Sequence, residues 1–418
     1  MILNSFYTKQ DTLLMIALPD IATKRLAIKL KPATQRMVKK GHPWVFEGGI
    51  TKQNAEGNAG DLAIIYDNKK NKFLACGLYD PNSPIRIKVL QFHKPANINS
   101  DWFRAKIQAA YDKRAPLLAT ETNSYRLLYG ENDGLPSLVA DVYKNIIVVK
   151  LYAAIWLPYL KEILPILLDI SQCTTMVLRL SRALQQQKNI GGLEDGQVLY
   201  GTLENEVVVF KEHGIAFSAN VIHGHKTGYF LDHRHNRLKI GNLSTGKKVL
   251  DVFAYAGGFS VHALAKGAKE VVSIDISAKA LEMAKQNAAL NPFSGEHRTM
   301  AVDAFQGLEQ LAKNNELFDI VVIDPPSFAK QESEVAGAKN SYQRLATLGT
   351  KLVKKGGLLV LASCTARIKA EDFFETVEQS LKLSHKQFEC LEKTYHDVDH
   401  PIGFPEGAYL KCAYYKAH

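Results

Sequence analysis

The stretch Val249–Val261, with the sequence VLDVFAYAGGFSV, begins a series of apolar runs that decides the fold of this chain. Three further runs follow it, at Val271–Asp275, Ile320–Asp324 and Leu358–Cys364. Each run precedes a turn and a helix-like segment. This alternation predicts a parallel sheet with crossover helices, in which the strands are buried on both faces. Polar residues gather where the runs end, which is where open α/β sheets bind ligands.

The first of these strands, Lys248–Val252, leads into a loop with a pair of glycines, Gly257 and Gly258. Glycine lets the backbone turn sharply and approach a ligand closely. The loop lacks the three spaced glycines of a dinucleotide fingerprint, and Asp251 would sit badly beside a pyrophosphate. Asp275 ends the second strand, where an acidic side chain can accept hydrogen bonds from a ribose. A ligand with a sugar, a positive charge and no phosphate, such as S-adenosylmethionine, fits this pattern.

The order of these features resembles the class I S-adenosylmethionine-dependent methyltransferases. The matching residues are Asp251-x-Phe-x-Tyr-x-Gly-Gly, Asp275, Asp303, Asp324-Pro-Pro and Ser363-Cys364-Thr365. More narrowly, the chain resembles the bacterial large-subunit (23S) rRNA cytosine-5 methyltransferases that carry an N-terminal PUA domain. The narrower resemblance covers nearly everything from about residue 25 onward. It rests on His42-Pro-Trp-Val-Phe, on residues 125–136 (YRLLYGENDGLP), on residues 223–234 (HGHKTGYFLDHR), on Asp399-His-Pro and on Phe404-Pro-Glu-Gly.

The resemblance implies an α/β fold with a Rossmann-like class I methyltransferase domain at the C-terminal end. A small β-barrel PUA domain and a small α+β central domain would precede it. The chain has 418 residues, 46% of them hydrophobic, which is enough for two or three domains with their own cores. Since no run of about 18 apolar residues occurs, no membrane span is expected. Five cysteines without C-x-x-C spacing argue against a disulfide framework or a zinc site and predict a reducing cytoplasm.

The net charge of +10 is unevenly distributed. Residues 1–100 carry +8, residues 101–215 carry −1 and residues 216–418 carry +3. A concentrated basic region favours a polyanion such as nucleic acid as partner. A solvated surface would show the same excess, so charge alone leaves both interpretations open.

Residues 1–24 are interpreted as an N-terminal extension, and residues 25–100 predict a small β-barrel or sandwich of short strands. Lys39, Lys40 and His42 lie beside Trp44, and such a mix of cations and an aromatic ring can hold phosphate and stack on a base. Trp44 and Phe46 fit a barrel core better when each is considered alone. The resemblance implies a PUA domain with Lys39, Lys40 and His42 near its RNA-binding face. The expected strands are Leu26–Leu30, Trp44–Phe46, Leu62–Tyr66, Phe73–Tyr79 and Ile85–Phe92.

Residues 101–215 predict the central α+β domain. One helix is expected over Asp101–Leu118, with Ser100 as its N-cap, and another over Trp156–Ile170. Residues 182–202 are polar and glycine-rich, which predicts a loop or a weak hairpin. A hairpin of Val207–Glu212 and Ile215–Ala219 then leads into the methyltransferase domain, residues 216–418. The expected central strands are 125–129, 138–142, 146–151 and 176–180.

Residues 223–236 form a dense polar segment just before the first sheet strand. Its histidines, at positions 223, 225, 233 and 235, lack carboxylate or cysteine companions at metal-ligand spacing, so no metal site is predicted. The resemblance implies instead that the segment forms a wall of the cofactor and substrate pocket. Use of the same residues as loop and cap residues remains an alternative. The implied wall residues are Lys226, Thr227, Tyr229, Asp232 and Arg234.

Cys364 and Asp324 carry the chemistry that methylation of a pyrimidine at C5 requires. C5 is a poor nucleophile until a thiolate adds at C6, and a donor at N3 can stabilise the charge that enters the ring. Cys364 follows a predicted strand, and Asp324 ends another, although a buried structural cysteine is the usual fate of a free thiol. Asp324 is followed by Pro325, Pro326, Ser327 and Phe328, which departs from the Asp-Pro-Pro-Tyr loop of exocyclic-amine methyltransferases. The resemblance implies that Cys364 is the nucleophile and that Pro325 and Phe328 lie beside the base.

The resemblance also implies where S-adenosylmethionine lies. The cofactor would cover the loop from Asp251 to Gly258, touching Phe253, Tyr255 and Gly257. Asp275 would hold the ribose, Asp303 would reach the adenine amine, and Asp324 would lie between methyl donor and base. Asp303 also fits the N-cap of a helix over Ala304–Lys313, and the two roles are compatible.

We therefore expect a cytoplasmic enzyme that forms 5-methylcytosine in 23S rRNA through a covalent cysteine intermediate. One rival is an RNA methyltransferase that acts on an exocyclic amine or a ring nitrogen, which would not need Cys364. Another is a non-catalytic RNA-binding ribosome assembly factor. The sequence leaves the target nucleotide and the oligomeric state open, a homodimer included.

Overall fold

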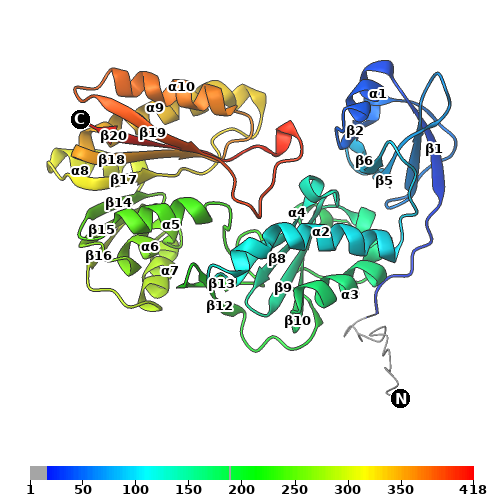
Figure 1. Ribbon diagram of the computed structural model, residues 1–418, viewed down its shortest axis with the longest axis horizontal. Helices are drawn as coiled ribbons and strands as arrows, with labels where there is room; N and C mark the ends of the chain where they lie inside the picture. The colour runs from blue at the N-terminus through cyan, green and yellow to red at the C-terminus, as the bar shows by residue number, and fades with distance from the viewer. Residues whose placement is uncertain (1–16, 188–189) are drawn as a thin grey trace, which may run out of the picture. The chain divides into compact units, whose positions relative to one another are not determined.

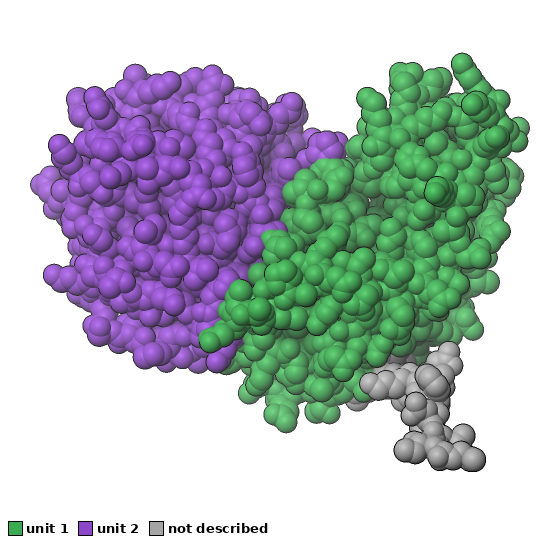
Figure 2. All heavy atoms as spheres, in the orientation of Figure 1, with its two compact units in different colours: residues 1–210, 218–231, 398–404 green, residues 211–217, 232–397, 405–418 purple. Residues whose placement is uncertain are grey.

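The computed structural model describes residues 17–187 and 190–418, and the chain forms two compact units (Figure 2). Unit 1 contains the chain up to Phe210, together with Ser218–Leu231 and Val398–Phe404. Unit 2 contains Lys211–Phe217, Asp232–Asp397 and Pro405–His418. The C-terminal part of the chain therefore contributes to both units. Of the predicted N-terminal extension, residues 1–16 lie outside the described residues, whereas Leu18 packs into the core of unit 1.

The first sheet of unit 1 has six strands in the order β2-β6-β5-β4-β1-β3. Exposed and buried side chains alternate along β1, so that Leu26, Ile28 and Leu30 enter one core. The helix α1 was not predicted, because its Pro32 is typical of a loop but is tolerated in a first helical turn. Five of the six strands follow the prediction to within one residue, whereas β3 was not predicted. The elements are β1 Arg25–Leu30, α1 Pro32–Lys39, β2 Trp44–Phe46, β3 Ile50–Gln53, β4 Leu62–Tyr66, β5 Phe73–Tyr79 and β6 Ile85–Phe92.

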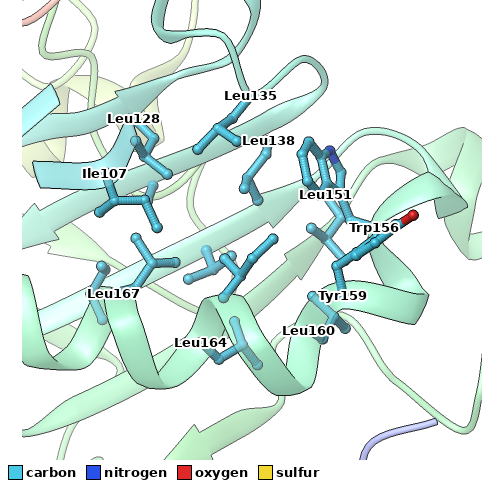
Figure 3. Close-up of a cluster of buried hydrophobic side chains, with 14 of the residues drawn as sticks. Ile107, Leu128, Leu135, Leu138, Leu151, Trp156, Tyr159, Leu160, Leu164 and Leu167 are labelled. Atoms are coloured by element: carbon cyan, nitrogen blue, oxygen red, sulfur yellow. The ribbon is translucent and has the colours of Figure 1, made fainter. Parts of the chain in front are cut away.

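The second sheet of unit 1 has five strands in the order β11-β10-β9-β8-β7. Figure 3 shows side chains of α2, α3 and this sheet meeting in one apolar cluster, with Ile107, Leu128 and Leu164 among them. Burial of this cluster is the main source of stability of the central part. The elements of this part are α2 Ser100–Leu118, β7 Ser124–Tyr129, β8 Leu138–Tyr143, β9 Ile146–Leu151, α3 Leu160–Ser171, β10 Thr175–Leu180, α4 Arg182–Gln185 and β11 Val198–Tyr200. The predicted hairpin of β12 Val207–Glu212 and β13 Ile215–Asn220 forms a separate two-stranded sheet, in which Lys211–Phe217 belong to unit 2.

Three local predictions in the central part need correction. Ser100 lies inside α2, and the N-cap is Asn99, whose side chain accepts a hydrogen bond from the Trp102 N–H. The predicted helix over Trp156–Ile170 starts as a 3-10 turn, Ala154–Tyr159, and becomes α-helical only at Leu160. Pro158 lies within that turn, and its missing N–H prevents an α-helical hydrogen bond there. The polar region 182–202 contains α4 and β11 as well as a loop.

Unit 2 is built on a seven-stranded sheet in the order β16-β15-β14-β17-β18-β20-β19. Strands β14 to β18 are mutually parallel, and β20 pairs antiparallel with both neighbours. Helices cover both faces, with α5, α6 and α7 on one and α8, α9 and α10 on the other (Figure 1). The elements are α5 Arg234–Leu243, β14 Lys248–Val252, α6 Gly258–Ala265, β15 Glu270–Asp275, α7 Ala278–Ala289, β16 Glu296–Ala301, α8 Ala304–Lys313, β17 Phe318–Ile323, α9 Val335–Leu352, β18 Val353–Ser363, α10 Ala370–Lys382, β19 Phe388–Thr394 and β20 Lys411–Ala417.

The strand order of unit 2 determines where its functional groups meet. From β14 the chain adds β15 and β16 on one side, and on the other side the sheet continues with β17, β18, β20 and β19. The direction of the strand order therefore reverses between β14 and β17. In open α/β sheets, a ligand binds at the carboxyl ends of the strands beside such a reversal. Asp251, Asp275, Asp324 and Cys364 all lie at these ends. The predicted α/β, Rossmann-like fold is confirmed.

No helix among the described residues combines the length and the apolar character needed to cross a membrane.

Candidate active site

The loop after β14 has an unusual backbone for its sequence. Phe253 and Tyr255 have φ angles of 65° and 49°, in the left-handed region that non-glycine residues avoid. Gly257 has a φ of 79°, and a Cβ atom there would come within 2.8 Å of the Ala284 Cβ. Conformations of this kind cost about 1–3 kcal/mol each and persist where the surroundings enforce them. The loop is thus held in one shape at the carboxyl end of the sheet.

Asp251 helps to fix the conformation of the β14 loop. Its side chain is 1% exposed, and its Oδ2 accepts hydrogen bonds from the Ser260 N–H and Oγ at 3.0 and 2.6 Å. These bonds join the end of β14 to the first turn of α6. Burial raises the pKa of Asp251 to about 7. Its Oδ1 is buried without a hydrogen-bond partner among the described residues, which suits a nearby cation such as an ammonium group.

Asp275 and Asp303 hold backbone groups at neighbouring strand ends. Asp275 Oδ2 accepts the Tyr255 N–H at 2.9 Å, and its Oδ1 accepts the Ser277 N–H at 2.9 Å. Asp275 therefore fixes the β14 loop and retains further acceptor positions for hydroxyl groups. Asp303 Oδ1 accepts the N–H groups of Phe305 and Gln306, so Asp303 is the N-cap of α8. This alternative role predicted for Asp303 is present, and it leaves Oδ2 for a ligand.

Asp324 is paired with a histidine that sequence analysis did not select for this role. His233 Nε2 lies 3.4 Å from Asp324 Oδ1, and His233 is 5% exposed. Burial lowers the pKa of His233, but the Asp324 carboxylate outweighs this, so that the pKa lies above its ordinary value. The Phe259 ring and the Asn236 side chain enclose the imidazole. The pair can hold a proton beside the open end of β17.

Cys364 follows β18 and faces the loop after β17. Its Sγ lies 3.7 Å from the Pro325 carbonyl oxygen, and the residue is partly exposed. Its neighbours Ser363 and Thr365 are held by the Tyr342 hydroxyl of α9, at 2.8 and 2.7 Å. The Thr365 hydroxyl also accepts the Phe328 N–H at 3.2 Å. One hydroxyl network thus fixes both sides of the thiol and ties it to the loop that carries Asp324.

The other four cysteines have a different setting. Cys76, Cys173 and Cys412 are buried, and Cys390 is exposed on β19. Burial raises the pKa of the Cys76, Cys173 and Cys412 thiols, and partial loss of solvent raises that of Cys390 as well. A raised pKa suppresses the reactive thiolate. Among the five, Cys364 is the one at the carboxyl end of a central parallel strand.

The predicted wall of residues 226–234 is divided between the two units. In unit 1, the Thr227 hydroxyl donates to Asp141 Oδ2 at 2.5 Å, and Tyr229 is buried with its N–H 3.2 Å from the Tyr143 hydroxyl. The Lys226 ammonium lies over the Phe230 ring, 4.6 Å from its centroid.

The other two wall residues belong to unit 2. Asp232 Oδ2 accepts a hydrogen bond from the Tyr409 hydroxyl at 2.7 Å. Arg234 is fully buried, and its guanidinium pairs with Asp397 and Glu212 at 3.4 and 3.8 Å. A guanidinium held in this way acts as a structural cation, so the loop-and-cap interpretation describes Arg234 better than direct substrate contact.

The predicted basic and aromatic group of the barrel lies in unit 1. Lys39 and Lys40 are both exposed, and Lys39 forms an ion pair with Asp67 at 2.5 Å. Trp44 Nε1 donates to Glu131 Oε1 at 3.0 Å, and its ring is 4.9 Å from that of Phe404, with His42 next to both. Trp44, Glu131 and Phe404 come from three of the motifs that carry the resemblance, and these motifs therefore meet in unit 1. Asp399 Oδ2 adds a further link by accepting the Arg126 N–H.

Comparison with known proteins agrees with this geometry. The family model for S-adenosylmethionine-dependent methyltransferases matches residues 126–406, and the model for PUA-like domains matches residues 28–92. The chain belongs to the S-adenosylmethionine-dependent methyltransferase family. Its cofactor is S-adenosylmethionine, and the PUA-like domain predicted at its N-terminal end is confirmed. The carboxylates of Asp251 and Asp275 at the β14 loop fit a ligand that carries an ammonium group and a ribose.

Curated relatives of this methyltransferase span nearly its whole length. A "Ribosomal RNA large subunit methyltransferase" from Deinococcus radiodurans is 42% identical over 402 residues, covering 95% of this chain and 98% of the relative. A "Ribosomal RNA large subunit methyltransferase I" from Aeromonas salmonicida is 34% identical, covering 92% and 97%. A solved Streptococcus mutans protein, assigned as a SAM-dependent methyltransferase, has a TM-score of 0.79 at 20% identity, covering 93% and 99%. Another solved methyltransferase, with the same TM-score and identity, is complexed with SAH and covers 94% and 100%.

Proposed function

We propose that this methyltransferase forms 5-methylcytosine in large-subunit (23S) rRNA, with Cys364 as a covalent nucleophile. The observation that carries the proposal is the placement of the Cys364 thiol 3.7 Å from the Pro325 carbonyl, against the loop that begins at Asp324. A nucleophile and an acid–base group at adjacent strand ends are what C5 methylation needs. The names of the curated relatives support large-subunit rRNA as the substrate.

The proposed reaction begins when the Cys364 thiolate forms a bond to C6 of the cytosine. Electrons of the ring move toward N3, which takes a proton from the Asp324–His233 pair. When bound, S-adenosylmethionine would supply an electrophilic methyl group for C5, and the electron pair of the broken methyl–sulfur bond would remain on sulfur. A base then removes the C5 proton, the C5–C6 double bond forms again, and the C6–S bond breaks. N3 returns its proton, so that the thiolate and the pair are restored.

The proposed role of Asp324 depends on its pairing with His233. A carboxylate can stabilise charge at N3 only if a proton is available to it at that moment. His233 Nε2, 3.4 Å from Asp324 Oδ1, can supply that proton and take it back. Pro325 and Phe328 would flank the base, because both follow Asp324 in the loop held by Thr365.

The PUA-like domain is proposed to supply much of the RNA affinity. Residues 1–100 carry +8 of the net charge of +10, and phosphate neutralisation dominates nucleic-acid affinity. Lys40 and His42 are proposed contacts on this domain, and Lys226 is a further proposed contact. Lys39 contributes less, because Asp67 already pairs with it.

An RNA that carries 5-fluorocytosine at the target position tests this proposal. Fluorine replaces the proton whose removal releases the enzyme, so the wild-type protein should remain linked to the RNA through Cys364. Mass spectrometry of the adduct should place the link on the Cys364 peptide. Cys364→Ser should give no adduct, and Cys390→Ser, a change of an exposed thiol elsewhere in unit 2, should trap normally.

A different result would assign another chemistry to the same fold. If Cys364→Ser methylates RNA at nearly the wild-type rate and the wild type gives no adduct, covalent catalysis is wrong. Nuclease digestion and mass spectrometry of the product would then reveal whether an exocyclic amine or a ring nitrogen carries the methyl group.

A further inference from the structure

Lys411, the first residue of β20, lies beside the turn that follows Cys364. It is 1% exposed, and its Nζ donates hydrogen bonds to the carbonyl oxygens of Thr365 at 2.6 Å, Ile368 at 2.7 Å and Tyr409 at 3.1 Å. Two of these carbonyls belong to the segment immediately after the thiol. In the sheet, Lys411 is the register partner of Ser363, the residue just before Cys364.

The three carbonyls favour the ammonium form of Lys411. An ammonium group has three N–H donors, one for each of these carbonyls, whereas a neutral amine has only two. No carboxylate lies within ion-pair distance of Nζ in the described part of the chain. Burial lowers the pKa of Lys411 to about 8, while the neighbouring Cys364 acts to raise it. A buried cation without a counter-ion is costly, and a negative charge forming nearby would offset that cost.

Three further contacts of Cys364 and its neighbours are described, and they differ from Lys411 in charge. The Asp324 loop faces it from β17, and a carboxylate there opposes formation of a thiolate. His233 compensates for Asp324, with which it is paired. Tyr342 of α9 reaches Ser363 and Thr365 through a neutral hydroxyl. Lys411, by contrast, places a positive charge directly on the Cys364 turn.

We propose that Lys411 is a positioning residue that fixes the turn after Cys364 and stabilises the Cys364 thiolate through its buried positive charge. This inference rests on the proposed function, since it concerns the same nucleophile. It deepens that proposal by naming the residue whose charge stabilises the thiolate. Lys411 was not among the residues that the sequence indicated for a role in the site.

Alkylation of Cys364 by iodoacetamide as a function of pH tests the inference without RNA or methyl transfer. The rate at the Cys364 peptide, followed by mass spectrometry, reports the fraction of thiolate. Lys411→Gln keeps hydrogen-bond donors but removes the charge, and it should move the alkylation midpoint upward by about one pH unit or more. Lys411→Arg keeps the charge and should keep the midpoint near the wild-type value.

The chain contains a matched control in Lys386. Its Nζ also donates to two backbone carbonyls, those of Thr350 at 2.9 Å and Val353 at 2.6 Å, but at the opposite end of β18 from Cys364. Lys386→Gln should therefore leave the Cys364 midpoint unchanged. If Lys411→Gln binds S-adenosylmethionine normally and keeps the wild-type midpoint, Lys411 only braces the turn and the inference is overturned.

A reciprocal measurement applies even if no Lys411 variant folds. Coupling between two titrating groups is mutual, so removal of the thiol must affect the lysine. In Cys364→Ala, the Lys411 amine, followed by 15N NMR, should titrate at a lower pH than in the wild type. An unchanged titration would also overturn the inference. Because both measurements omit RNA, they can contradict the role of Lys411 while the methylation proposal stands. The 5-fluorocytosine experiment can likewise contradict the methylation proposal without contradicting the role of Lys411.

Discussion

Two neighbouring halves of the unit 2 sheet edge hold their functional groups in different ways. At β14 and β15, the carboxylates of Asp251 and Asp275 bond to main-chain N–H groups, and strained backbone at Phe253 and Tyr255 shapes the loop. At β17 and β18, three side chains make the contacts: His233 pairs with Asp324, the Tyr342 hydroxyl bonds to Ser363 and Thr365, and Lys411 bonds to the turn after Cys364. We propose that the half at β14 and β15 is a preformed cradle for the cofactor and that the half at β17 and β18 holds the nucleophile in a network of exchangeable protons. The two halves should fail differently when they are mutated.

The largest expected effect follows from loss of the proposed nucleophile. Cys364→Ser should reduce methyl transfer by several orders of magnitude, because a hydroxyl is a far weaker nucleophile than a thiolate. Titration calorimetry should show unchanged affinity for S-adenosylmethionine, since the thiol is not part of the cradle. A matching loss of cofactor affinity would contradict the division into two halves.

The next effect should appear in the cradle. Asp275→Ala removes the acceptor for the Tyr255 and Ser277 N–H groups, together with the proposed ribose contact. Two or three lost hydrogen bonds, at about 1 kcal/mol each, predict a Kd for S-adenosylmethionine that rises about 30- to 150-fold. Glu270→Gln, at the other end of β15, is the matched control and should bind normally. Equal Kd values for the two variants would remove Asp275 from the cofactor site.

A smaller effect should distinguish the proton network. His233→Gln should lower methyl transfer about tenfold and change its pH profile, whereas cofactor affinity should persist. Because the folded-state pKa of His233 is raised, its pairing with Asp324 stabilises the fold below the unfolded-state pKa of about 6.5. That contribution is lost as the pH rises through the folded-state value. The Tm difference between wild type and variant should be larger at pH 6 than at pH 9, and a pH-independent difference would argue against a charged pair.

The smallest effect lies in the PUA-like domain. Lys40→Gln should weaken RNA binding a few-fold and lower the slope of log Kd against log salt by about 1, as expected for one phosphate contact. Lys39→Gln should change the slope less, because Asp67 pairs with that ammonium. Fluorescence anisotropy over a salt series would measure both. Identical slopes for wild type and Lys40→Gln would leave this lysine as a solubilising surface charge.

The sequence alone determined the parts of this protein that depend on local pattern. Apolar runs predicted the observed bounds of β14, Lys248–Val252, and of four barrel strands, because alternation and turn residues act over short distances. The spacing of Asp251, Asp275, Asp324 and Cys364 placed them at strand ends, because parallel strands bring their carboxyl ends to one edge. Local pattern failed at α1, where Pro32 occupies the first turn, and at the cap of α2.

Tertiary structure alone decided what each of those residues contacts. Asp324 and His233 are 91 positions apart, and Lys411 reaches the Thr365 carbonyl across 46 positions of chain. No periodicity or motif spacing encodes such pairs, since they arise only when separate strands and loops pack together. Packing also turned the predicted contact residue Arg234 into a buried structural cation. Burial, charge and hydrogen-bond geometry are properties of the assembled sheet edge, and they give the Cys364 turn its proposed reactivity.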